Sequence, residues 1–362
     1  MECNSSTLTV TANQTADHQE IQEEALNANP AVYNAVIVSS SGIVPPLTAG
    51  TIRPLDDLVA KYGSHLPPTQ LVTIDGKIMA IAYGANAQHF MYRTDILAAA
   101  GVAIPKTYEE VISAAEAIRS AGLMQYPITG TYKAGWNLGE EFVNLYVGLQ
   151  GEFFEPGTAV ISVNNDKGVA ALNMMKQLAS YMHPDYLTFD STAVATQLTQ
   201  GQHAMANVWG SRGAFVLDPA NHAEGVTGNV EFGAAPTIGG GSTPATTMWW
   251  GGIVIATNQS DEEAEVAFQV MLEGADSEMV RANNDLLVWL DPAYDPQPAT
   301  VGVFASAAGG APSYPMMPFM GLLHTAFGSN IADFLQGKES ASQTLTDISD
   351  AYTAGAKEAG YL

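Results

Sequence analysis

TTMWWGGIVIAT, residues 246–257, places Trp249 and Trp250 side by side before two glycines and an apolar strand. Neighbouring side chains of a strand point to opposite faces, so one indole can pack in the core while the other faces a ligand. Gly251 and Gly252 let something approach the backbone closely. Indole faces suit flat apolar surfaces such as the C–H face of a sugar ring. The stretch predicts the wall of a binding cleft, and we expect Trp249 rather than Trp250 to face the ligand.

The composition limits the class of protein. The chain has 362 residues, enough for two domains, and 47% of them are hydrophobic. Acidic residues outnumber basic ones by 37 to 13, which gives a formal net charge of −24. Such a surface repels phosphate backbones and excludes nucleic acid as a partner, whereas it suits a secreted or salt-tolerant protein. No apolar run reaches the ~18 residues that a membrane span needs.

Cysteine and histidine usage argues against a metal site. Cys3 is the single cysteine and the 7 histidines are scattered without metal-ligand spacing, so we expect neither metal nor cofactor. No apolar signal segment precedes Cys3, and we expect a periplasmic protein whose signal peptide is absent from this sequence. A cell-surface lipoprotein anchored through Cys3 is the weaker alternative, because the lipobox is missing.

Strands and helices alternate along the chain, which predicts an α/β fold. We expect strands at 8–10 and 33–38, and a hairpin of 71–74 and 77–82 around the turn signal Asp75-Gly76. Thr107 with Glu110 and Ser260 with Glu263 have the capping-box spacing of helix starts. Further helices are expected at 19–27, 138–149, 169–182, 192–200, 322–335 and 341–359.

Gly- and Pro-rich stretches predict that the chain crosses between two lobes more than once. They lie at 104–106, 236–247 and 292–298. Crossings near 105, 247 and 300 would give an N-terminal lobe of 1–104 plus 250–300. The C-terminal lobe would be 107–246 plus 305–362. Repeated crossing favours a hinged pair of lobes over two independent domains.

Several motifs in order resemble a known family. DGK at 75–77 leads to YGAN at 83–86, MYRTDIL at 91–97 and PKTYEE at 105–110. QGQHAMANVWG at 200–210, WGGIVI at 250–255 and FLQGKES at 334–340 continue the pattern. From residue 33 to the end, the chain resembles the extracellular solute-binding proteins of ABC importers, family 1, the maltose-binding-like group.

The resemblance implies a two-lobed periplasmic-binding-protein type II fold. Each lobe would be a mixed sheet flanked by helices, with a ligand cleft between lobes that closes by hinge motion. It implies a monomer that binds a small carbohydrate and meets ABC permease subunits transiently at the membrane. The family usually has a strand, a long helix and another strand before the strand at 33–38. Here one strand and one helix fit, so we expect the first lobe to lack a βα unit.

Aromatic residues at element ends are candidate ligand contacts beside the tryptophan pair. Trp209 ends a strand before the loop 210–213, and Trp136 stands before the helix at 138–149, whose start borders the cleft in the resembled family. Tyr132 lies in the same loop as Trp136, and Tyr83 lies in the YGAN motif. The alternative for each ring is a place in the core.

Polar candidates would bind hydroxyl groups. Ser40 and Ser41 follow a strand at its carboxyl end, where ligands bind in open α/β sheets. Asn86 matches a junction position that commonly contacts sugar hydroxyls, and its amide both donates and accepts. Arg212 offers a planar fork for a hydroxyl pair or a carboxylate, with a salt bridge as the alternative. Glu140, near the start of the helix at 138–149, completes the set.

No catalytic motif stands out, so we expect no enzyme activity. Glu140 and Glu141 could supply half of a glycosidase pair, but adjacent carboxylates on a helix diverge. A glycoside hydrolase is therefore the enzymatic alternative to a carbohydrate-binding protein. An importer component for an amine, osmolyte or peptide is a further alternative, which the acidic surface keeps open and the tryptophans disfavour.

Overall fold

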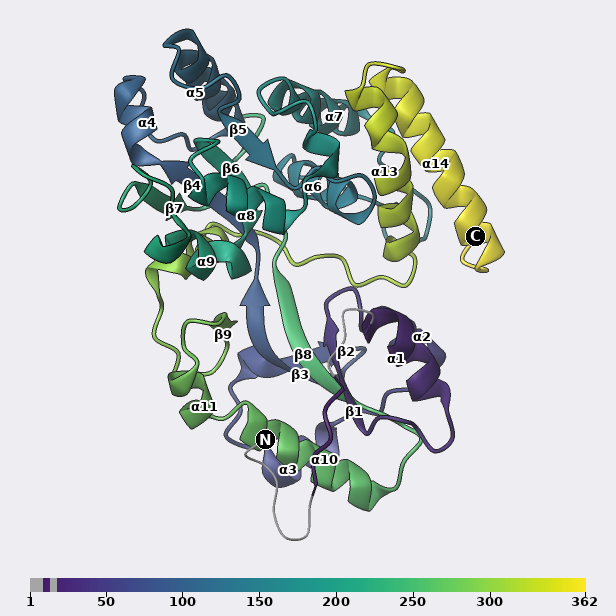
Figure 1. Ribbon diagram of the computed structural model, residues 1–362. Helices are drawn as coiled ribbons and strands as arrows, with labels where there is room; N and C mark the ends of the chain where they lie inside the picture. Colours follow the sequence, from purple (N-terminus) through teal and green to yellow (C-terminus); the bar gives the residue numbers. More distant parts are fainter. Residues whose placement is uncertain (1–8, 14–17) are drawn as a thin grey trace. The chain divides into compact units, whose positions relative to one another are not determined.

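The computed structural model describes residues 9–13 and 18–362, and it divides into two compact units (Figure 1). Unit 1 contains the described residues up to Asn86 together with Trp249–Pro296 and Tyr314–Pro318. Unit 2 contains Ala87–Met248, Gln297–Ser313 and Phe319–Leu362. Neither unit is a continuous piece of chain.

Unit 1 is built on a sheet with the strand order β1-β8-β3-β2, and β9 pairs with β3. Between β2 and β3, Asp75 and Gly76 both have positive φ, 49° and 75°, as a tight hairpin turn requires. The predicted hairpin is therefore confirmed. The strands are β1 Ala35–Ser39, β2 Leu71–Ile74, β3 Lys77–Asn86, β8 Trp249–Ile255 and β9 Val288–Trp289.

The pairings in the unit 1 sheet are antiparallel, where the sequence led us to expect a mixed sheet. A parallel pair needs two strands joined by a crossover connection. Among the described residues before β1 there is a helix, α1, but no strand. Of the strand expected at 8–10, Leu8 lies outside the described residues, and Thr9 and Val10 are not in a strand.

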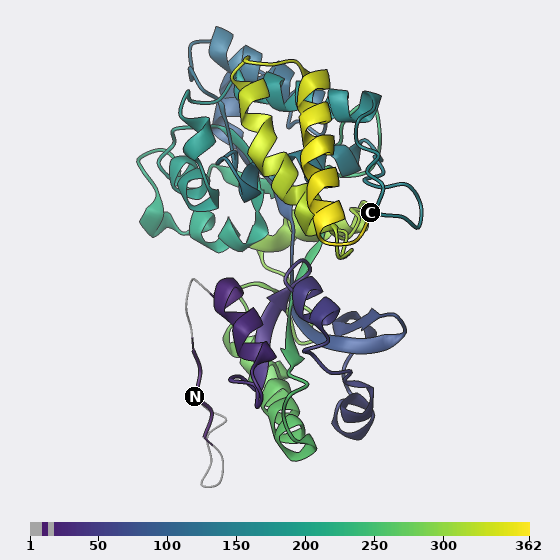
Figure 2. The ribbon, with the colours of Figure 1, turned by 90° about the vertical axis from the view of Figure 1, so that its right-hand side faces the viewer.

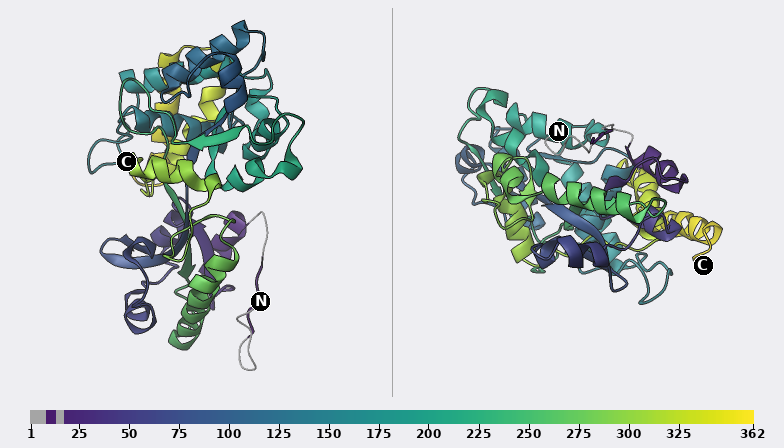
Figure 3. Two further views of the ribbon diagram at one scale, coloured as in Figure 1. Left: turned by 90° about the vertical axis from the view of Figure 1, so that its left-hand side faces the viewer. Right: turned by 90° about the horizontal axis from the view of Figure 1, so that it is seen from below.

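Helices cover both faces of the unit 1 sheet. Val254 packs with Leu26 and Ile43 on one face, and its neighbour Ile255 packs with Leu58 and Phe268 on the other. Figure 3 shows α10 along one face of this sheet. The helical segments are α1 His18–Asn27, α2 Val44–Ala49, α3 Asp56–Tyr62, α10 Asp261–Gly274, α11 Ser277–Ala282 and the 3-10 turn η1 Pro68–Gln70.

Unit 2 contains a mixed sheet with the strand order β5-β6-β4-β7, in which β5 and β6 are parallel. The strands are β4 Gln88–Arg93, β5 Ile128–Gly130, β6 Met205–Trp209 and β7 Val230–Gly233. Apolar side chains of β4, β6 and β7 form a core with α8 and α9. In Figure 2 the long C-terminal helices α13 and α14 lie side by side in this unit.

The helices of unit 2 are α4 Thr94–Ala99, α5 Tyr108–Ser120, α6 Trp136–Gly148, α7 Asp166–Ala179, α8 Ser191–Thr199, α9 Gly213–Leu217, α12 Val301–Ala308, α13 Met320–Leu335 and α14 Ala341–Glu358. Periodicity and capping signals predicted six of them close to their observed bounds, and they did not predict α4, α9 and α12. Four 3-10 turns join the helices: η2 Tyr186–Thr188, η3 Gly210–Arg212, η4 Pro219–Asn221 and η5 Pro298–Thr300. Both predicted capping boxes are present, at Thr107 before α5 and at Ser260 before α10.

The first crossing between the units lies earlier in the chain than expected. Residues 87–104 belong to unit 2 because β4 pairs with β6 and β7, so the first crossing follows Asn86 instead of lying near 105. Only Ala87 separates β3 from β4, and such a short connection leaves no loop signal in the sequence. The chain crosses again after Met248 and Pro296, and the short return Tyr314–Pro318 was not expected.

Within the described part of the chain, no helix combines the length and the apolar character needed to cross a membrane.

Candidate functional site

The unit 1 candidates gather at one end of its sheet. β1 ends where β8 begins, with Ser39 opposite Gly251. On the other side of β8, Asn86 at the end of β3 lies opposite Trp249. Pairing alone therefore brings together seven residues that the sequence singled out: Ser40, Ser41, Tyr83, Asn86, Trp249, Trp250 and Gly251.

Ser40 has a structural role at this sheet end. Its side chain is buried, and its Oγ accepts a hydrogen bond of 3.0 Å from the backbone N–H of Trp250. This bond fixes the start of β8 and leaves Ser40 out of reach of a ligand, contrary to expectation. Ser41 is half-buried, with its Oγ 3.4 Å from that of Ser39.

The two adjacent tryptophans differ in exposure. Trp249 is only 8% exposed and its ring lies 4.2 Å from that of Tyr314, centroid to centroid. Trp250 is half-buried and packs against the core that contains Val38 and Met79. The alternation expected for a strand holds, but Trp250 rather than Trp249 keeps the more accessible ring.

Gly251 and Gly252 allow close approach, as predicted, but the approaching atoms belong to the protein. A Cβ on Gly251 would lie 3.2 Å from the hydroxyl oxygen of Tyr83, and one on Gly252 would lie 2.8 Å from the carbonyl oxygen of Ile81. Tyr83 is half-buried beside Trp289, and burial raises the pKa of its hydroxyl. Gly251 therefore makes room for Tyr83.

Unit 2 presents a stack of three rings. The rings of Trp136 and Trp209 lie 6.2 Å apart with planes 27° from parallel. The ring of His324 lies 4.8 Å from that of Trp136 at 16°. Trp136 is 46% exposed, Trp209 is half-buried and His324 is buried. The stack brings together the start of α6, the end of β6 and the first turns of α13.

Glycines where α6 meets α13 position this stack. A Cβ on Gly328 would lie 2.4 Å from the carbonyl oxygen of Gly135, and one on Gly139 would lie 2.8 Å from Cδ2 of His324. Gly135 caps α6 with φ 95°, which favours glycine. The close helix contact lets His324 reach under Trp136.

The hydrogen bond and the burial of His324 define the protonation state of its ring. Its Nε2 lies 2.8 Å from the backbone carbonyl oxygen of Trp136, so this nitrogen carries the proton and donates. Burial lowers the pKa of His324 to about 4, partly opposed by that hydrogen bond. The imidazole is therefore neutral at physiological pH. Sequence reasoning missed His324, because a lone histidine inside an apolar helix pattern resembles any core histidine.

Arg212 is the last residue of the 3-10 turn η3, which directly follows Trp209. Its Nε and Nη2 both donate to the Oγ of Ser191, at 3.1 and 3.0 Å. Among the residues that the structure describes, no carboxylate comes within ion-pair distance of it, so the salt-bridge alternative does not apply. The half-buried guanidinium keeps donors for a further acceptor.

Tyr132 and Glu140 are buried, so the structure does not support them as ligand contacts. Tyr132 is 1% exposed and faces the interior of unit 2. Glu140 is also 1% exposed, and its Oε1 accepts a 2.8 Å hydrogen bond from the hydroxyl of Thr247. Glu141, also buried, accepts hydrogen bonds from Gln88 and Thr131. These carboxylates stabilise the interior and do not form an exposed catalytic pair.

Comparison with known proteins supports the resemblance seen in the sequence. The family described as bacterial extracellular solute-binding protein matches residues 31–273. A probable ABC transporter-binding protein of Deinococcus radiodurans is 26% identical over 290 residues, which is 75% of this chain. The chain spans 63% of the length of that relative.

Solved structures share the fold at low sequence identity. A solute-binding protein of Agrobacterium radiobacter K84, in complex with ribitol, has a TM-score of 0.75 at 21% identity, over 89% of this chain and 85% of the other. Maltose-bound MalE3 of T. maritima also has a TM-score of 0.75, at 17% identity over 88% and 84%. A solute-binding protein of Agrobacterium vitis S4 with bound D-mannitol has a TM-score of 0.74, at 19% identity over 91% and 86%.

These matches confirm the α/β solute-binding fold that the motifs implied. They also confirm the expected class, because the matching family binds solutes and is not one of enzymes. Since the family match covers more than half of the sequence, the chain belongs to the bacterial extracellular solute-binding proteins.

Proposed function

We propose that this protein binds a small sugar, oligosaccharide or polyol outside the cytoplasm and delivers it to an ABC importer. The observation that carries the proposal is the Trp209–Trp136–His324 stack of unit 2, whose middle ring, that of Trp136, is 46% exposed. An exposed indole that neighbouring rings hold in place is pre-organised, so little side-chain entropy is lost when a sugar ring packs against it.

Polar groups near element ends would supply hydroxyl contacts. Arg212 follows Trp209 by three positions and has unused donors, which suits a pair of vicinal hydroxyls. On unit 1, Asn86, Ser41 and Tyr83 are half-buried at the sheet end, with Trp250 as the more accessible indole. We propose these residues as contacts and leave out Ser40, Trp249, Tyr132 and Glu140, because each is buried.

The ligands of similar structures support a hydroxyl-rich ligand. Ribitol, D-mannitol and maltose are bound in the three structures compared above. A further similar structure is a cyclic α-maltosyl-1,6-maltose binding protein from Arthrobacter globiformis. The sequence identities are below 25%, so these likenesses support the class of ligand and not a particular sugar.

The partner and the location follow from the family and from the relative in Deinococcus radiodurans. Both concern extracellular binding or ABC transport. We therefore propose ABC permease subunits as the transient membrane partner and the periplasm or cell surface as the location. Hinge closure on binding, which the resemblance implies, stays a prediction that small-angle X-ray scattering with and without ligand would measure.

A thermal-shift screen followed by calorimetry tests the proposed ligand class. The panel is ribitol, D-mannitol, maltose and other sugars, with choline, glycine betaine and short peptides as the competing classes. We expect a polyhydroxylated compound to raise the melting temperature by mass action, and Trp136→Ala to weaken its binding. Leu123→Ala, at another exposed apolar side chain of unit 2, is the matched control and should leave binding unchanged. Stabilisation by choline or betaine alone would replace carbohydrate by a cationic ligand.

A further inference from the structure

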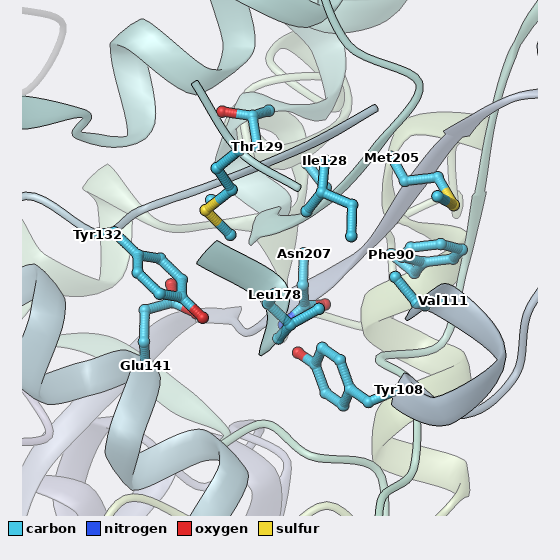
Figure 4. A pocket seen from close by; sticks show the side chains of 13 residues that line it. Phe90, Tyr108, Val111, Ile128, Thr129, Tyr132, Glu141, Leu178, Met205 and Asn207 are labelled. Carbon is cyan, nitrogen blue, oxygen red and sulfur yellow. The ribbon is translucent and has the colours of Figure 1, made fainter. Parts of the chain in front are cut away.

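Unit 2 contains a small internal cavity, away from the aromatic stack. Its volume is about 20 Å³, and its lining residues come from β4, β5, β6, α5, α6 and α7 and from the loops that follow β5 and α7 (Figure 4). Every side chain of the lining is buried. A cavity of roughly 10–15 Å³ on this measure holds one water molecule, so the space fits a single water.

Two polar atoms of the cavity lining are buried without a partner. The hydroxyl oxygen of Tyr132 and the Oδ1 of Asn207 make no hydrogen bond with any described residue. Their side chains are 1% and 7% exposed. In Figure 4 the hydroxyl ends of Tyr132 and Tyr108 point toward the middle of the cavity, with Glu141 beside Tyr132 and Asn207 beside Tyr108.

A dry cavity would leave both atoms unsatisfied. Each buried polar atom that has lost its hydrogen bonds to water costs about 1–3 kcal/mol, and such groups are rare in native proteins. An apolar occupant would not remove this cost. A metal cation needs six or more oxygen ligands, or several waters of its own, and the space is too small for these.

We propose that the cavity is a hydration site that binds one ordered water molecule. The water accepts a hydrogen bond from the hydroxyl of Tyr132 and donates one to the Oδ1 of Asn207. The carboxylate of Glu141, which lies at the edge of the cavity, offers an acceptor for its second hydrogen. With these contacts the water has the two to four polar partners typical of buried waters.

The proposed water would complete a hydrogen-bond network that extends to the start of unit 2, where the chain first leaves unit 1. The Nδ2 of Asn207 donates to the Oε1 of Gln88 at 3.1 Å, and the Nε2 of Gln88 donates to the Oε1 of Glu141 at 2.9 Å. Thr131 donates to the same carboxylate. Gln88 is the second residue of unit 2, so the water joins the loop after β5, strand β6 and helix α6 to the segment by which the chain enters this unit.

Tyr132→Phe tests the water site by the sign of its effect. If water is bound, the variant loses one hydrogen bond, and urea denaturation should show an unfolding equilibrium constant raised roughly five-fold. If the cavity is dry, the variant removes an unsatisfied hydroxyl, so the same constant should fall. Phenylalanine keeps the ring and its packing, so the variant should fold.

Tyr352→Phe is the matched control. Tyr352 is also fully buried in unit 2, and its hydroxyl donates to the carbonyl oxygen of Ala159 at 2.6 Å. The change in the unfolding equilibrium constant of Tyr352→Phe measures the effect of removing a tyrosine hydroxyl whose hydrogen-bond partner is known. A change of the same sign and similar size in Tyr132→Phe supports the water, and a change of opposite sign overturns it.

Two further measurements keep the proposal open to refutation. A high-resolution crystal structure should show a water peak within hydrogen-bond distance of Tyr132 and Asn207, and empty density there would overturn the site. Unfolding in sodium, potassium and choline chloride at equal ionic strength should give the same urea midpoint. Stabilisation by sodium or potassium over choline would replace the water by a bound cation.

Discussion

Tryptophans at the element ends of the two units have opposite surroundings. In unit 1, Trp249 is covered by Tyr314 and is almost fully buried. In unit 2, Trp136 stacks with both His324 and Trp209 and remains nearly half exposed. The exposure that remains decides the role: an almost fully buried indole stabilises the fold, whereas an indole that stays nearly half exposed is available for binding. The contrast makes the aromatic stack of unit 2 the stronger candidate for ligand recognition.

The largest effect that would test this contrast is on stability. Trp249→Ala should lower the free energy of unfolding by about 3–5 kcal/mol, because it leaves a cavity beside Tyr314. Trp136→Ala should cost much less, about 1 kcal/mol or below, because its ring is largely exposed. Urea denaturation of both variants measures the difference. Equal losses would remove the distinction between the two indoles.

The reverse order is expected for ligand affinity. Trp136→Ala should weaken binding of the ligand found in the screen by about 10- to 100-fold, or roughly 1.4–2.8 kcal/mol, because the stacking surface is lost. Trp249→Phe, which keeps an aromatic ring against Tyr314, should change affinity by less than about three-fold. Isothermal titration calorimetry gives both values. A larger loss for Trp249→Phe would shift recognition to unit 1.

Two serines at the end of β1 give a smaller contrast within unit 1. Ser40→Ala removes the acceptor of the Trp250 N–H and should destabilise the protein by about 1–2 kcal/mol. Ser41→Ala, at the half-buried neighbour, should stay within about 0.5 kcal/mol of the wild type. Thermal denaturation of both variants is the measurement. A loss at Ser41 as large as at Ser40 would contradict the assigned roles.

The smallest predicted effect is a pH dependence of stability that comes from His324, the residue that stacks on Trp136. The pKa of His324 is lowered to about 4 in the folded protein, below its ordinary value of 6.5, so the unfolded chain binds more protons between these values. His324 therefore makes the folded state less stable as the pH falls from 6.5 toward 4. The stability difference between wild type and His324→Gln should shrink by about 1 kcal/mol from pH 7.5 to 5.5. A difference that stays constant would mean that His324 does not titrate as its burial requires.

Local signals predicted the longer helices and the hairpin of unit 1. The Asp75-Gly76 turn and the two capping boxes are fixed by a few neighbouring residues, so they could be found without knowledge of the fold. The boundary after Asn86 could not be predicted, because the single residue between β3 and β4 carries no turn signal. Only the pairing of β4 with distant strands assigns it to unit 2.

The sequence identified several residues of the candidate site, but it could not show which of their side chains are exposed. The sequence identified Trp136, Trp209 and Arg212, and the structure places the two rings together. It did not reveal that Tyr314 covers Trp249 or that His324 supports Trp136, because both contacts join segments far apart in the chain. Which atoms cover a side chain depends on tertiary packing, and sequence spacing carries no information about it.

The strand order β1-β8-β3 has a consequence for how the protein is made. β8 lies between β1 and β3, yet Trp249 follows Asn86 by 163 positions, the difference of the two numbers. At roughly 5–20 residues per second, the ribosome needs about 8–30 s to supply this central strand after β3 has emerged. Until then the facing edges of β1 and β3 lack their partner, and open strand edges promote pairing with other chains. The newly made N-terminal segment therefore has two unpaired strand edges until β8 arrives.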